Sequence, residues 1–463
     1  MSSFADHPPV APAPPAPPPA TEWRNLPADQ QPAWPDPSRT ARVQDQLALA
    51  PALTAPGDVR RLGSALAHTG AGRAFLLQAG DCAEPVGAAG VAAVRGKHRV
   101  IGEMAEIISE ASGLPTVTVG RIAGQYAKPR SRPQETVGDR VLPVYRGDLV
   151  NSPDADERAR IPDPRRMLLG YSTARAVLNE LHLIAHESAL TLHSWDGWDQ
   201  WDGWDGRRVT GGPGLPTRAW DGSLRSVLRD YGQTILLDGA WRRTGLWTSH
   251  EALVLDYEQA LVRRDAHTGE EYLLSTHLPW VGERTRRLDG AHLAFLARIA
   301  GPVACKVGPA TDPGTLREIC ARLDPHRRPG RLTLIGRFGA GRVREVLPGL
   351  VEAARSAGHE VVWVCDPMHG NTVTTSRGVK TRRLSDVLDE ITGFFEVLRR
   401  AGQWPGGVHL EIAGDDVTEC LGAGGPDGED GLGRAYRTLC DPRLNDAQAL
   451  LVARTVSELI AKG

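Results

Sequence analysis

The sequence predicts an α/β protein built as a (β/α)8 TIM barrel with an N-terminal extension and inserted loops. From about residue 70 onward, eight short apolar runs alternate with stretches of helical periodicity. Polar or charged residues follow nearly every one of these runs. In such a barrel the carboxyl ends of all the strands meet at one mouth, where active sites lie. A doubly wound open sheet is the competing fold.

The expected elements follow in chain order. The eight strands are Ala74–Ala79, Pro115–Gly120, Ala189–His193, Leu278–Gly282, Val303–Val307, Leu332–Gly336, Val361–Cys365 and Val408–Ile412. Apolar residues at three- and four-residue spacing predict helices over Arg99–Ala111, Ala291–Ile299, Pro313–Leu323, Arg342–Ala357 and Leu384–Arg400.

The beginning of the chain differs in composition from the rest. Twelve of the 35 prolines fall within the first 40 residues, and the run Val10–Pro19 offers no core of its own. We therefore expect residues 1–38 to form a proline-rich, disordered tail, followed by a single catalytic domain over residues 39–463. Trp23 and the segment Gln31–Asp36 suggest an alternative, an arm that packs on a partner subunit.

Composition excludes several classes of protein. The net charge is −2, so no global positive field is available to bind nucleic acid. No apolar stretch reaches 18 residues, and no basic start precedes an apolar run. Six cysteines are too few for a disulfide scaffold. We expect a cytoplasmic enzyme with no membrane segment.

Four of the residues at the strand ends are cationic: Arg121, Arg284, Lys306 and Arg337. One such residue is usually a surface ion pair, but four at matching strand ends favour a binding site. Arginine binds carboxylate and phosphate through a fixed fork, and lysine binds them as a point charge. The pattern predicts a small polyanionic substrate, such as a phosphorylated carboxylic acid.

A second set of residues could ligate a divalent metal. Its members are Cys82, His369, Glu411 and Asp441. A thiolate, an imidazole and two carboxylates suit Mn, Fe, Co or Zn better than Mg alone. Sequence spacing does not show that the four meet, and a lone cysteine or histidine is usually structural.

At these residues the chain resembles the class II (plant-type) 3-deoxy-D-arabino-heptulosonate 7-phosphate synthases, abbreviated DAHP synthases. The motifs are Gln78–Glu84, Gly120–Ser131, Tyr145–Asp148, Ser249–Leu253, Trp280–Thr285, Lys306–Pro309, Cys365–Thr372, Glu411–Gly414, Val417–Cys420 and Cys440–Asn445. The resemblance covers about residues 31–190 and 245–463.

The resemblance implies a (β/α)8 barrel that condenses phosphoenolpyruvate with erythrose 4-phosphate to DAHP and phosphate, the first step of the shikimate pathway. It implies one divalent ion, Mn²⁺ or Co²⁺ first and Fe²⁺ or Zn²⁺ as alternatives, on the four candidate ligands named above. Phosphoenolpyruvate would be held by Arg121, Glu283, Arg284, Lys306 and Arg337. Erythrose 4-phosphate would lie towards Lys128, Pro129, Arg130 and Ser131. We expect a homo-oligomer, a dimer or a tetramer.

The implied chemistry assigns roles to four catalytic residues. Attack by C3 of phosphoenolpyruvate on the aldehyde leaves cationic character at C2, to which water adds before phosphate leaves by C–O cleavage. We expect Glu283 to position or deprotonate that water, and Lys306 or His369 to supply a proton. Arg337 is the fourth and would help to hold phosphoenolpyruvate. Because Asp441 is an implied ligand, its neighbour Cys440 suggests a reversible disulfide with Cys82 in the metal-free enzyme. The alternative is that Cys440 points away.

The stretch at about 194–222 departs from the family. It repeats Trp-Asp units, at Trp195, Trp198, Trp201 and Trp204, and is rich in glycine. We interpret it as a repeat-expanded surface insert rather than a ligand-contacting loop. Because the chain departs from housekeeping members, a role in secondary metabolism is expected. The alternatives are an aminoDAHP synthase that uses an imino or amino sugar phosphate, and a catalytically silent homologue.

Overall fold

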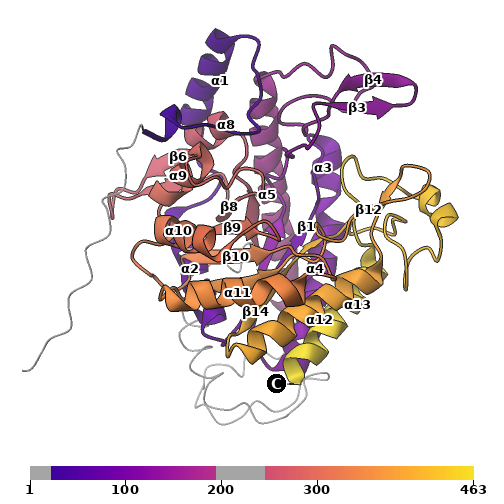
Figure 1. Ribbon diagram of the computed structural model, residues 1–463. Coiled ribbons are helices and arrows are strands. Elements are labelled where there is room, and N and C mark those ends of the chain that lie inside the picture. Colours follow the sequence, from indigo (N-terminus) through magenta and orange to yellow (C-terminus); the bar gives the residue numbers. More distant parts are fainter. Residues whose placement is uncertain (1–21, 194–245, 463) are drawn as a thin grey trace, which may run out of the picture.

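Eight parallel strands close into a barrel in the computed structural model, which describes residues 22–193 and 246–462. In chain order the strands are β1 (Phe75–Gly80), β2 (Thr116–Arg121), β5 (Trp247–Glu251), β8 (Leu278–Val281), β9 (Val303–Val307), β10 (Leu332–Gly336), β11 (Val362–Cys365) and β14 (Pro405–Glu411). Each pairs with the next, and β14 returns to pair with β1. The predicted (β/α)8 fold is confirmed (Figure 1).

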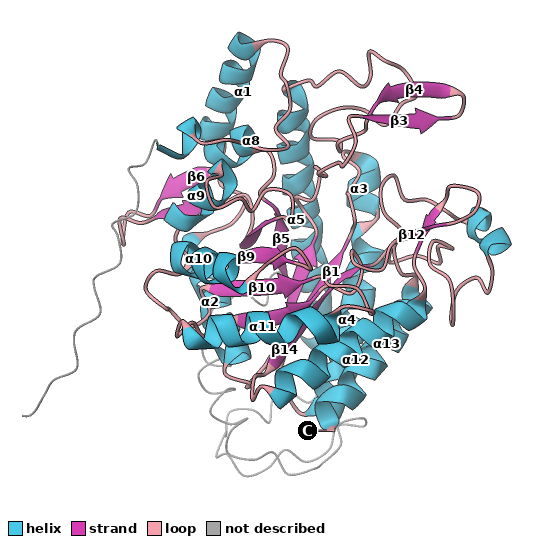
Figure 2. Cartoon of the chain, in the orientation of Figure 1, coloured by secondary structure: helices cyan, strands magenta, loops and turns pink. Residues whose placement is uncertain are grey.

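Helices surround the strands on the outside (Figure 2). They are α3 (Ala88–Ala92), α4 (Val94–Ser112), α5 (Arg165–His193), α8 (Leu255–Ala260), α9 (Ala291–Arg298), α10 (Pro313–Leu323), α11 (Val343–Ser356), α12 (Leu384–Arg400) and α13 (Asp446–Ala461), after α1 (Pro37–Leu49) and α2 (Pro56–Gly70). The described elements also include two 3-10 helices, η1 (Glu22–Asn25) and η3 (Glu429–Arg434). Three two-stranded sheets complete them: β3 (Gln134–Val137) with β4 (Arg140–Pro143), β6 (Val262–Arg264) with β7 (Glu271–Leu273), and β12 (Val373–Thr374) with β13 (Lys380–Thr381).

Seven of the eight predicted strands are confirmed to within a few residues, and the third is wrong. Residues 189–193 belong to the end of α5, and the third barrel strand is β5. Alanine and leucine are strong helix formers, so the apolar run that ends at His193 extends a long helix. The true strand reads Trp-Thr-Ser-His-Glu and lacks the apolar run by which the other strands were recognised.

The barrel interior is a packed core that α2 closes at the amino ends of the strands. Leu62 and Leu66 of α2 pack with Leu76 of β1, Trp247 of β5 and Val362 of β11 in one buried cluster. A second, larger cluster lies between the strands and the outer helices. With one end of the barrel filled by α2, the carboxyl ends of the strands form the open mouth.

The first described residues are packed against the barrel. Trp23 is buried and its ring lies 5.1 Å from that of Phe295, on α9 of the same chain. The Gln30 amide bonds the backbone of Arg130, with its oxygen 2.9 Å from the Arg130 N–H and its nitrogen 3.2 Å from the Arg130 carbonyl. Gln31 bridges Leu253 and Leu255 in the same way, at 2.7 and 3.0 Å. Residues 22–38, grouped with the tail by composition, thus form a strap across the loops after β2 and β5.

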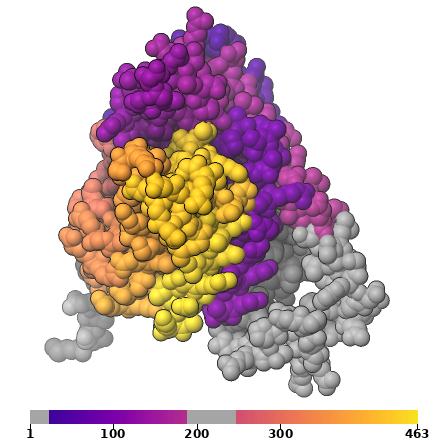
Figure 3. Space-filling view, turned by 90° about the vertical axis from the view of Figure 1, so that its right-hand side faces the viewer, coloured from indigo at the N-terminus to yellow at the C-terminus, as the bar shows by residue number. Residues whose placement is uncertain are grey.

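Figure 3 shows C-terminal residues, in yellow, side by side with purple residues from around position 100 on one face of the molecule, where α13 packs against α4. The Trp-Asp-rich insert at about 194–222 lies outside the described residues. Within residues 22–193 and 246–462, no helix combines the length and the apolar character that crossing a bilayer requires.

Candidate active site

Strand geometry carries the candidate residues to the mouth and turns them inward. Side chains two positions apart on a strand face the same side. Val119 of β2 and Ala304 of β9 belong to the interior cluster, so Arg121 and Lys306, two residues further on, also face inward. The same alternation places Glu411 inward above His409 on β14. The alternation of side chains along parallel strands therefore brings the expected residues together at the mouth, although hundreds of positions separate some of them in the chain.

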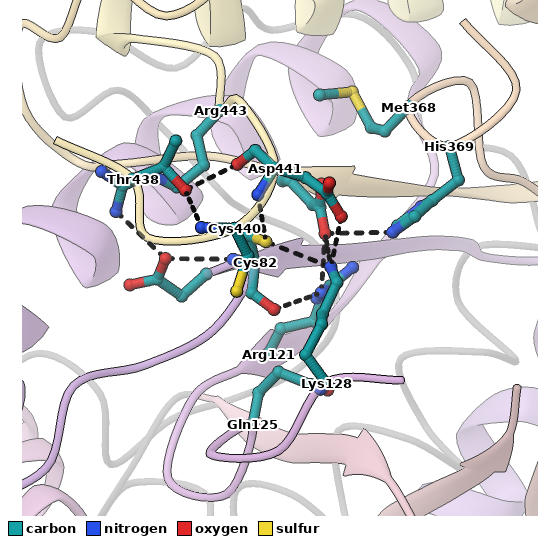
Figure 4. A network of polar contacts seen from close by, with 12 residues as sticks. Cys82, Arg121, Gln125, Lys128, Met368, His369, Thr438, Cys440, Asp441 and Arg443 are labelled. Carbon is teal, nitrogen blue, oxygen red and sulfur yellow. Dashed lines mark hydrogen bonds and ion pairs between the residues drawn. The ribbon is translucent and has the colours of Figure 1, made fainter. Parts of the chain in front are cut away.

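The four candidate metal ligands come together. The ligand atoms of Cys82, Glu411 and Asp441 lie within 4.8 Å of one another. His369 joins them, with Nε2 3.1 Å from Glu411 Oε1 (Figure 4). Cys82 and Glu411 are fully buried, and the side chains of His369 and Asp441 are each 16% exposed. Three of the four candidate ligands therefore form one cluster, and His369 contacts that cluster through Glu411.

A buried carboxylate orients the histidine. His369 Nδ1 lies 2.8 Å from Asp366 Oδ2, and the Asp366 side chain is fully buried. This leaves Nε2 facing Glu411. A carboxylate behind Nδ1 is the usual support of a histidine that ligates metal through Nε2, because it fixes the ring orientation and the tautomer.

The ammonium of Lys128 shows that the donor set attracts a cation. Its Nζ lies 3.1 Å from Cys82 Sγ, 3.1 Å from Glu411 Oε1 and 3.0 Å from Asp441 Oδ2. The Asp441 N–H also donates to Cys82 Sγ, at 3.1 Å. Burial raises the pKa of the Cys82 thiol, so a cation is needed to stabilise its thiolate. A soft sulfur, an imidazole and two carboxylates fit a borderline divalent metal.

Glu411 is the centre of the charge network. Its Oε1 accepts from Arg121 at 3.0 Å as well as from Lys128, and Arg382 lies 2.8 Å from its Oε2. Burial acts to raise the pKa of Glu411, but His369, Lys128, Arg382 and Arg121 together hold it well below the usual range of a carboxyl. Glu411 is therefore ionised throughout the physiological range.

The indole ring of Trp280 lies close to two of the cations. The guanidinium of Arg121 and the ammonium of Lys306 lie 5.5 and 5.7 Å from the ring centroid of Trp280, which is almost fully buried. Lys306 Nζ also lies 2.8 Å from Asp366 Oδ2. Burial lowers the pKa of Lys306, although Asp366 opposes the shift. Cation–π attraction to the buried ring holds both cations in place, and their positive charge can still attract an anion.

Arg121 is held by a polar chain inside the barrel. Its Nη1 lies 2.7 Å from His409 Nε2, and His409 Nδ1 lies 2.7 Å from the side-chain oxygen of Gln78. A guanidinium can only donate, so Nε2 accepts and Nδ1 carries the proton. Burial and the charges of Lys306 and Arg121 lower the pKa of His409 well below its ordinary value, which agrees with a neutral ring.

The remaining predicted residues form pairs around the mouth. Arg284 Nη2 donates to Ser131 Oγ at 2.7 Å, which joins the loops after β8 and β2. Glu283 Oε1 accepts from Arg286 at 2.7 Å, whereas its buried Oε2 has no hydrogen-bond partner among the described residues. Arg337 Nη2 donates to the backbone oxygen of His369 at 3.1 Å.

Arg130 lies on the sulfur side of the metal cluster. Its Nη1 lies 3.4 Å from Cys440 Sγ, and its Nη2 donates to Glu135 at 2.8 Å. Cys440 in turn is hydrogen-bonded to Cys82, and that bond lowers the pKa of Cys440. Both thiols are free and buried.

A second buried network sets the spacing between the two ligand loops. Arg443 donates to Asp81, next to Cys82, at 3.0 Å and to Glu419 at 2.8 Å. Glu419 also accepts the backbone N–H groups of Arg437, Thr438 and Arg443, at 3.1, 2.8 and 2.7 Å. Lys97 completes the network, 2.6 Å from Asp81. The loop that carries Asp441 is thereby tied to the loop that carries Cys82.

Lysine is rare in this chain, and its placement is uneven. Of the five lysines, Lys97, Lys128, Lys306 and Lys380 take part in the networks around the mouth. Lys380 lies 2.8 Å from Asp441 Oδ1 and its side chain is 43% exposed. The fifth, Lys462, is exposed after the end of α13.

Several residues of the site were not predicted. Glu419 and Arg443 lie within motifs that were recognised, but nothing in those motifs indicated which residue braces which. Asp366 lies within the motif Cys365–Thr372 but had no predicted role, and nothing in the sequence singled out Arg382. Each acts through a contact across the fold, which one sequence does not reveal.

Comparisons with known proteins show similarity to one family. A family model described as the class-II DAHP synthetase family matches residues 18–457. The phospho-2-dehydro-3-deoxyheptonate aldolase of Streptomyces coelicolor is 43% identical over 440 residues, which cover 94% of this chain and 96% of that protein. The phospho-2-dehydro-3-deoxyheptonate aldolase AroG of Mycolicibacterium smegmatis is 40% identical over 467 aligned positions, covering 98% of each chain. A probable phospho-2-dehydro-3-deoxyheptonate aldolase of Pseudomonas fluorescens is 42% identical over 421 residues, covering 91% of this chain and 92% of that protein.

Proposed function

This chain belongs to the class-II DAHP synthetase family, and from that premise we infer that it is a phospho-2-dehydro-3-deoxyheptonate aldolase, or DAHP synthase. It condenses phosphoenolpyruvate with erythrose 4-phosphate and water to give DAHP and phosphate, the first step of the shikimate pathway. The observation that carries the residue assignments is the convergence of four metal-ligand types with a ring of cations at one barrel mouth.

We propose that Cys82, His369, Glu411 and Asp441 hold one divalent ion, with Mn²⁺ or Co²⁺ as the first candidates. Two observations support this site: the types of the four ligand atoms, and the position of the Lys128 ammonium, a positive charge held among three of them. A bound divalent ion supplies Lewis acidity for the aldehyde oxygen of the sugar phosphate. Asp366 keeps the His369 ring in the ligating orientation.

The cations of the mouth bind the two anionic substrates in this proposal. Arg121 and Lys306 take the carboxylate side of phosphoenolpyruvate over Trp280, and Arg337 and Arg284 take its phosphate. The loop of Lys128, Arg130 and Ser131 receives erythrose 4-phosphate. Two phosphorylated anions repel each other, and the fixed positive charges offset that repulsion before the reaction begins.

Three residues are candidates for the water and proton steps. C3 of phosphoenolpyruvate forms the new bond to the aldehyde carbon, water adds at C2, and phosphate leaves with the bridging oxygen. Glu283 Oε2, which has no hydrogen-bond partner within the described part of the chain, is suited to accept the proton of that water. Lys306 is the first candidate proton donor, because burial lowers its pKa and eases release of its proton. His369 is the second candidate.

A steady-state assay tests the function. The purified chain is stripped with a chelator and refilled separately with Mn²⁺, Co²⁺, Fe²⁺ or Zn²⁺, and turnover of phosphoenolpyruvate with erythrose 4-phosphate is followed. We expect turnover to be lost on stripping and restored by at least one of these ions. Absence of turnover with every ion would contradict the proposed function. Phosphoenolpyruvate labelled with ¹⁸O at the bridging position should yield labelled phosphate, and retention of the label in the sugar product would contradict C–O cleavage.

Cys82 and Cys440 predict sensitivity to oxidation in the metal-free protein. Their thiols are in hydrogen-bond contact, and a metal on Cys82 would protect its sulfur from reaction. Treatment of the stripped protein with a mild disulfide-forming oxidant should couple the two sulfurs, with the two electrons passing to the oxidant. We expect that metal alone then fails to activate the sample and that reductant plus metal succeeds.

The count of free thiols checks this result directly. It should fall by two per chain on oxidation and return on reduction. The variant Cys440→Ser should stay activatable by metal alone after the same treatment, whereas Cys320→Ser, at a buried position on helix α10, should behave like wild type. Equal activation of the oxidised wild type with and without reductant would show that no such bond forms.

A further inference from the structure

Two loops of the mouth touch each other above β10 and β11. The loop after β10 carries Arg337, and the loop after β11 carries His369. The glycines of the two loops are packed so closely that a Cβ on Gly370 would lie 2.3 Å from the Gly339 nitrogen. Arg337 Nη2 also donates to the His369 carbonyl, at 3.1 Å. The two loops are therefore in direct contact at the mouth.

A buried glutamate on α12 lies beneath this contact. Glu390 is fully buried, and its Oε1 accepts the N–H groups of Phe338 and Gly339, at 2.7 and 2.9 Å. Its Oε2 accepts from Asn371 Nδ2 at 2.7 Å. One oxygen therefore binds the loop of Arg337, and the other binds the loop of His369.

Turning over the side-chain amide of Asn371 would break its hydrogen bonds. Its Oδ1 accepts the N–H of Ala340, at 3.0 Å, and its Nδ2 also donates to the Pro367 carbonyl, at 2.8 Å. A flipped amide would turn its NH₂ towards the Ala340 N–H and its oxygen towards Pro367. A buried donor or acceptor left without a partner costs about 1–3 kcal/mol, so the observed arrangement is strongly preferred.

We propose that Glu390 is a positioning residue that couples the binding of phosphoenolpyruvate at Arg337 to the binding of the metal at His369. The inference rests on the proposed function, which gives those two residues their ligands. A ligand that orders one loop also orders the other through the Glu390–Asn371 contact. Such coupling is reciprocal, so each ligand raises the affinity for the other by the same factor.

The variant Glu390→Gln separates this role from a general structural one. The Gln oxygen can still accept from Phe338 and Gly339, but its NH₂ faces the Asn371 NH₂, so the side-chain link from α12 to the loop of His369 is broken while the direct contact between the loops remains. The control is Glu396→Gln, on the same helix, where the glutamate pairs with Arg344 and is 39% exposed. Asn371→Ala removes the link from the other side, should Glu390→Gln fail to fold.

The measurement is the affinity for Mn²⁺ by calorimetry, with and without saturating phosphoenolpyruvate, together with the affinity for phosphoenolpyruvate with and without Mn²⁺. We expect a coupling factor of at least about fivefold in wild type and in Glu396→Gln. In Glu390→Gln and Asn371→Ala it should fall below about twofold, while each ligand alone still binds.

Three outcomes would overturn the inference. A wild-type coupling factor near one, or an undiminished factor in Glu390→Gln and Asn371→Ala, would refute it and leave the proposed function intact. Failure of wild type to bind either ligand would refute the proposed function and this inference with it. A loss of folding in Glu390→Gln transfers the same comparison to Asn371→Ala.

Discussion

The variant Glu411→Gln is expected to lose metal binding and to lower activity by more than about a thousandfold, while folding less stably. The side chain keeps its shape but loses the charge that Arg121, Lys128 and Arg382 face in a fully buried position. Removing one partner of a buried ion pair typically costs about 3–5 kcal/mol, because the remaining charges stay desolvated. Denaturant unfolding of the metal-free proteins measures this loss, and calorimetry with Mn²⁺ measures the loss of binding.

The loss of stability in Glu411→Gln should depend on pH. The folded-state pKa of Glu411 is held well below the ordinary value of 4.5, so its contribution to stability is complete above that value and declines as pH falls below it. The difference in the free energy of unfolding between wild type and Glu411→Gln should therefore be constant near neutrality and shrink in acid. Glu396→Gln on the surface of α12 is the control and should change stability by less than about 1 kcal/mol. A stable Glu411→Gln protein with full activity would contradict the assignment of Glu411 as ligand and charge centre.

The variant Lys306→Met is expected to reduce kcat/KM for phosphoenolpyruvate by about a thousandfold. It removes the ammonium that lies 5.7 Å from the Trp280 ring centroid and 2.8 Å from Asp366. Methionine fills nearly the same space, so the loss reports charge and proton donation rather than packing. Lys306→Arg should rescue little, because a planar guanidinium does not fit a position built for a compact ammonium.

Metal affinity distinguishes the role of Lys306 from that of the ligands. Asp366 still holds the His369 ring in Lys306→Met, so Mn²⁺ should bind within a few-fold of wild type. Lys462→Met, on an exposed residue at the end of the chain, is the control and should retain wild-type kinetics. If Lys306→Met lost its metal as completely as Glu411→Gln, the ammonium would be part of the metal site and not of the substrate site.

Strand periodicity and residue chemistry were sufficient to predict most of the barrel. Buried parallel strands read as apolar runs, and β9, β10 and β11 are of this kind. The exception, β5, contributes Ser249 and Glu251 to the polar upper part of the barrel interior, where Ser249 Oγ lies 2.9 Å from Gln78. A strand whose inward residues are polar lacks the apolar pattern by which buried strands are predicted. The polar side chains of β5 therefore explain why it was missed.

The chemistry of the site was more predictable than its support. Cationic residues at strand ends indicated the anion site, because barrel geometry brings strand ends together. The set of metal ligands was implied by the family resemblance. Glu390, Glu419 and Arg382 lie on helices or in loops that meet the site only after folding. A buried glutamate that accepts backbone N–H groups looks in sequence like any charged residue of an amphipathic helix. Its role depends on tertiary contacts that carry no local pattern.

Because lysine is scarce in this chain, few side-chain amines are exposed to reagents that modify amines. Lys97, Lys128 and Lys306 are buried, so among the described lysines an acylating reagent would reach Lys462 and the half-exposed Lys380. Helix α13 begins beside the loop of Asp441 and runs 16 residues away from it, about 24 Å, before Lys462. A support or dye attached through Lys462 would therefore leave the mouth facing solution. Modification of Lys380 would in contrast report directly on the entrance.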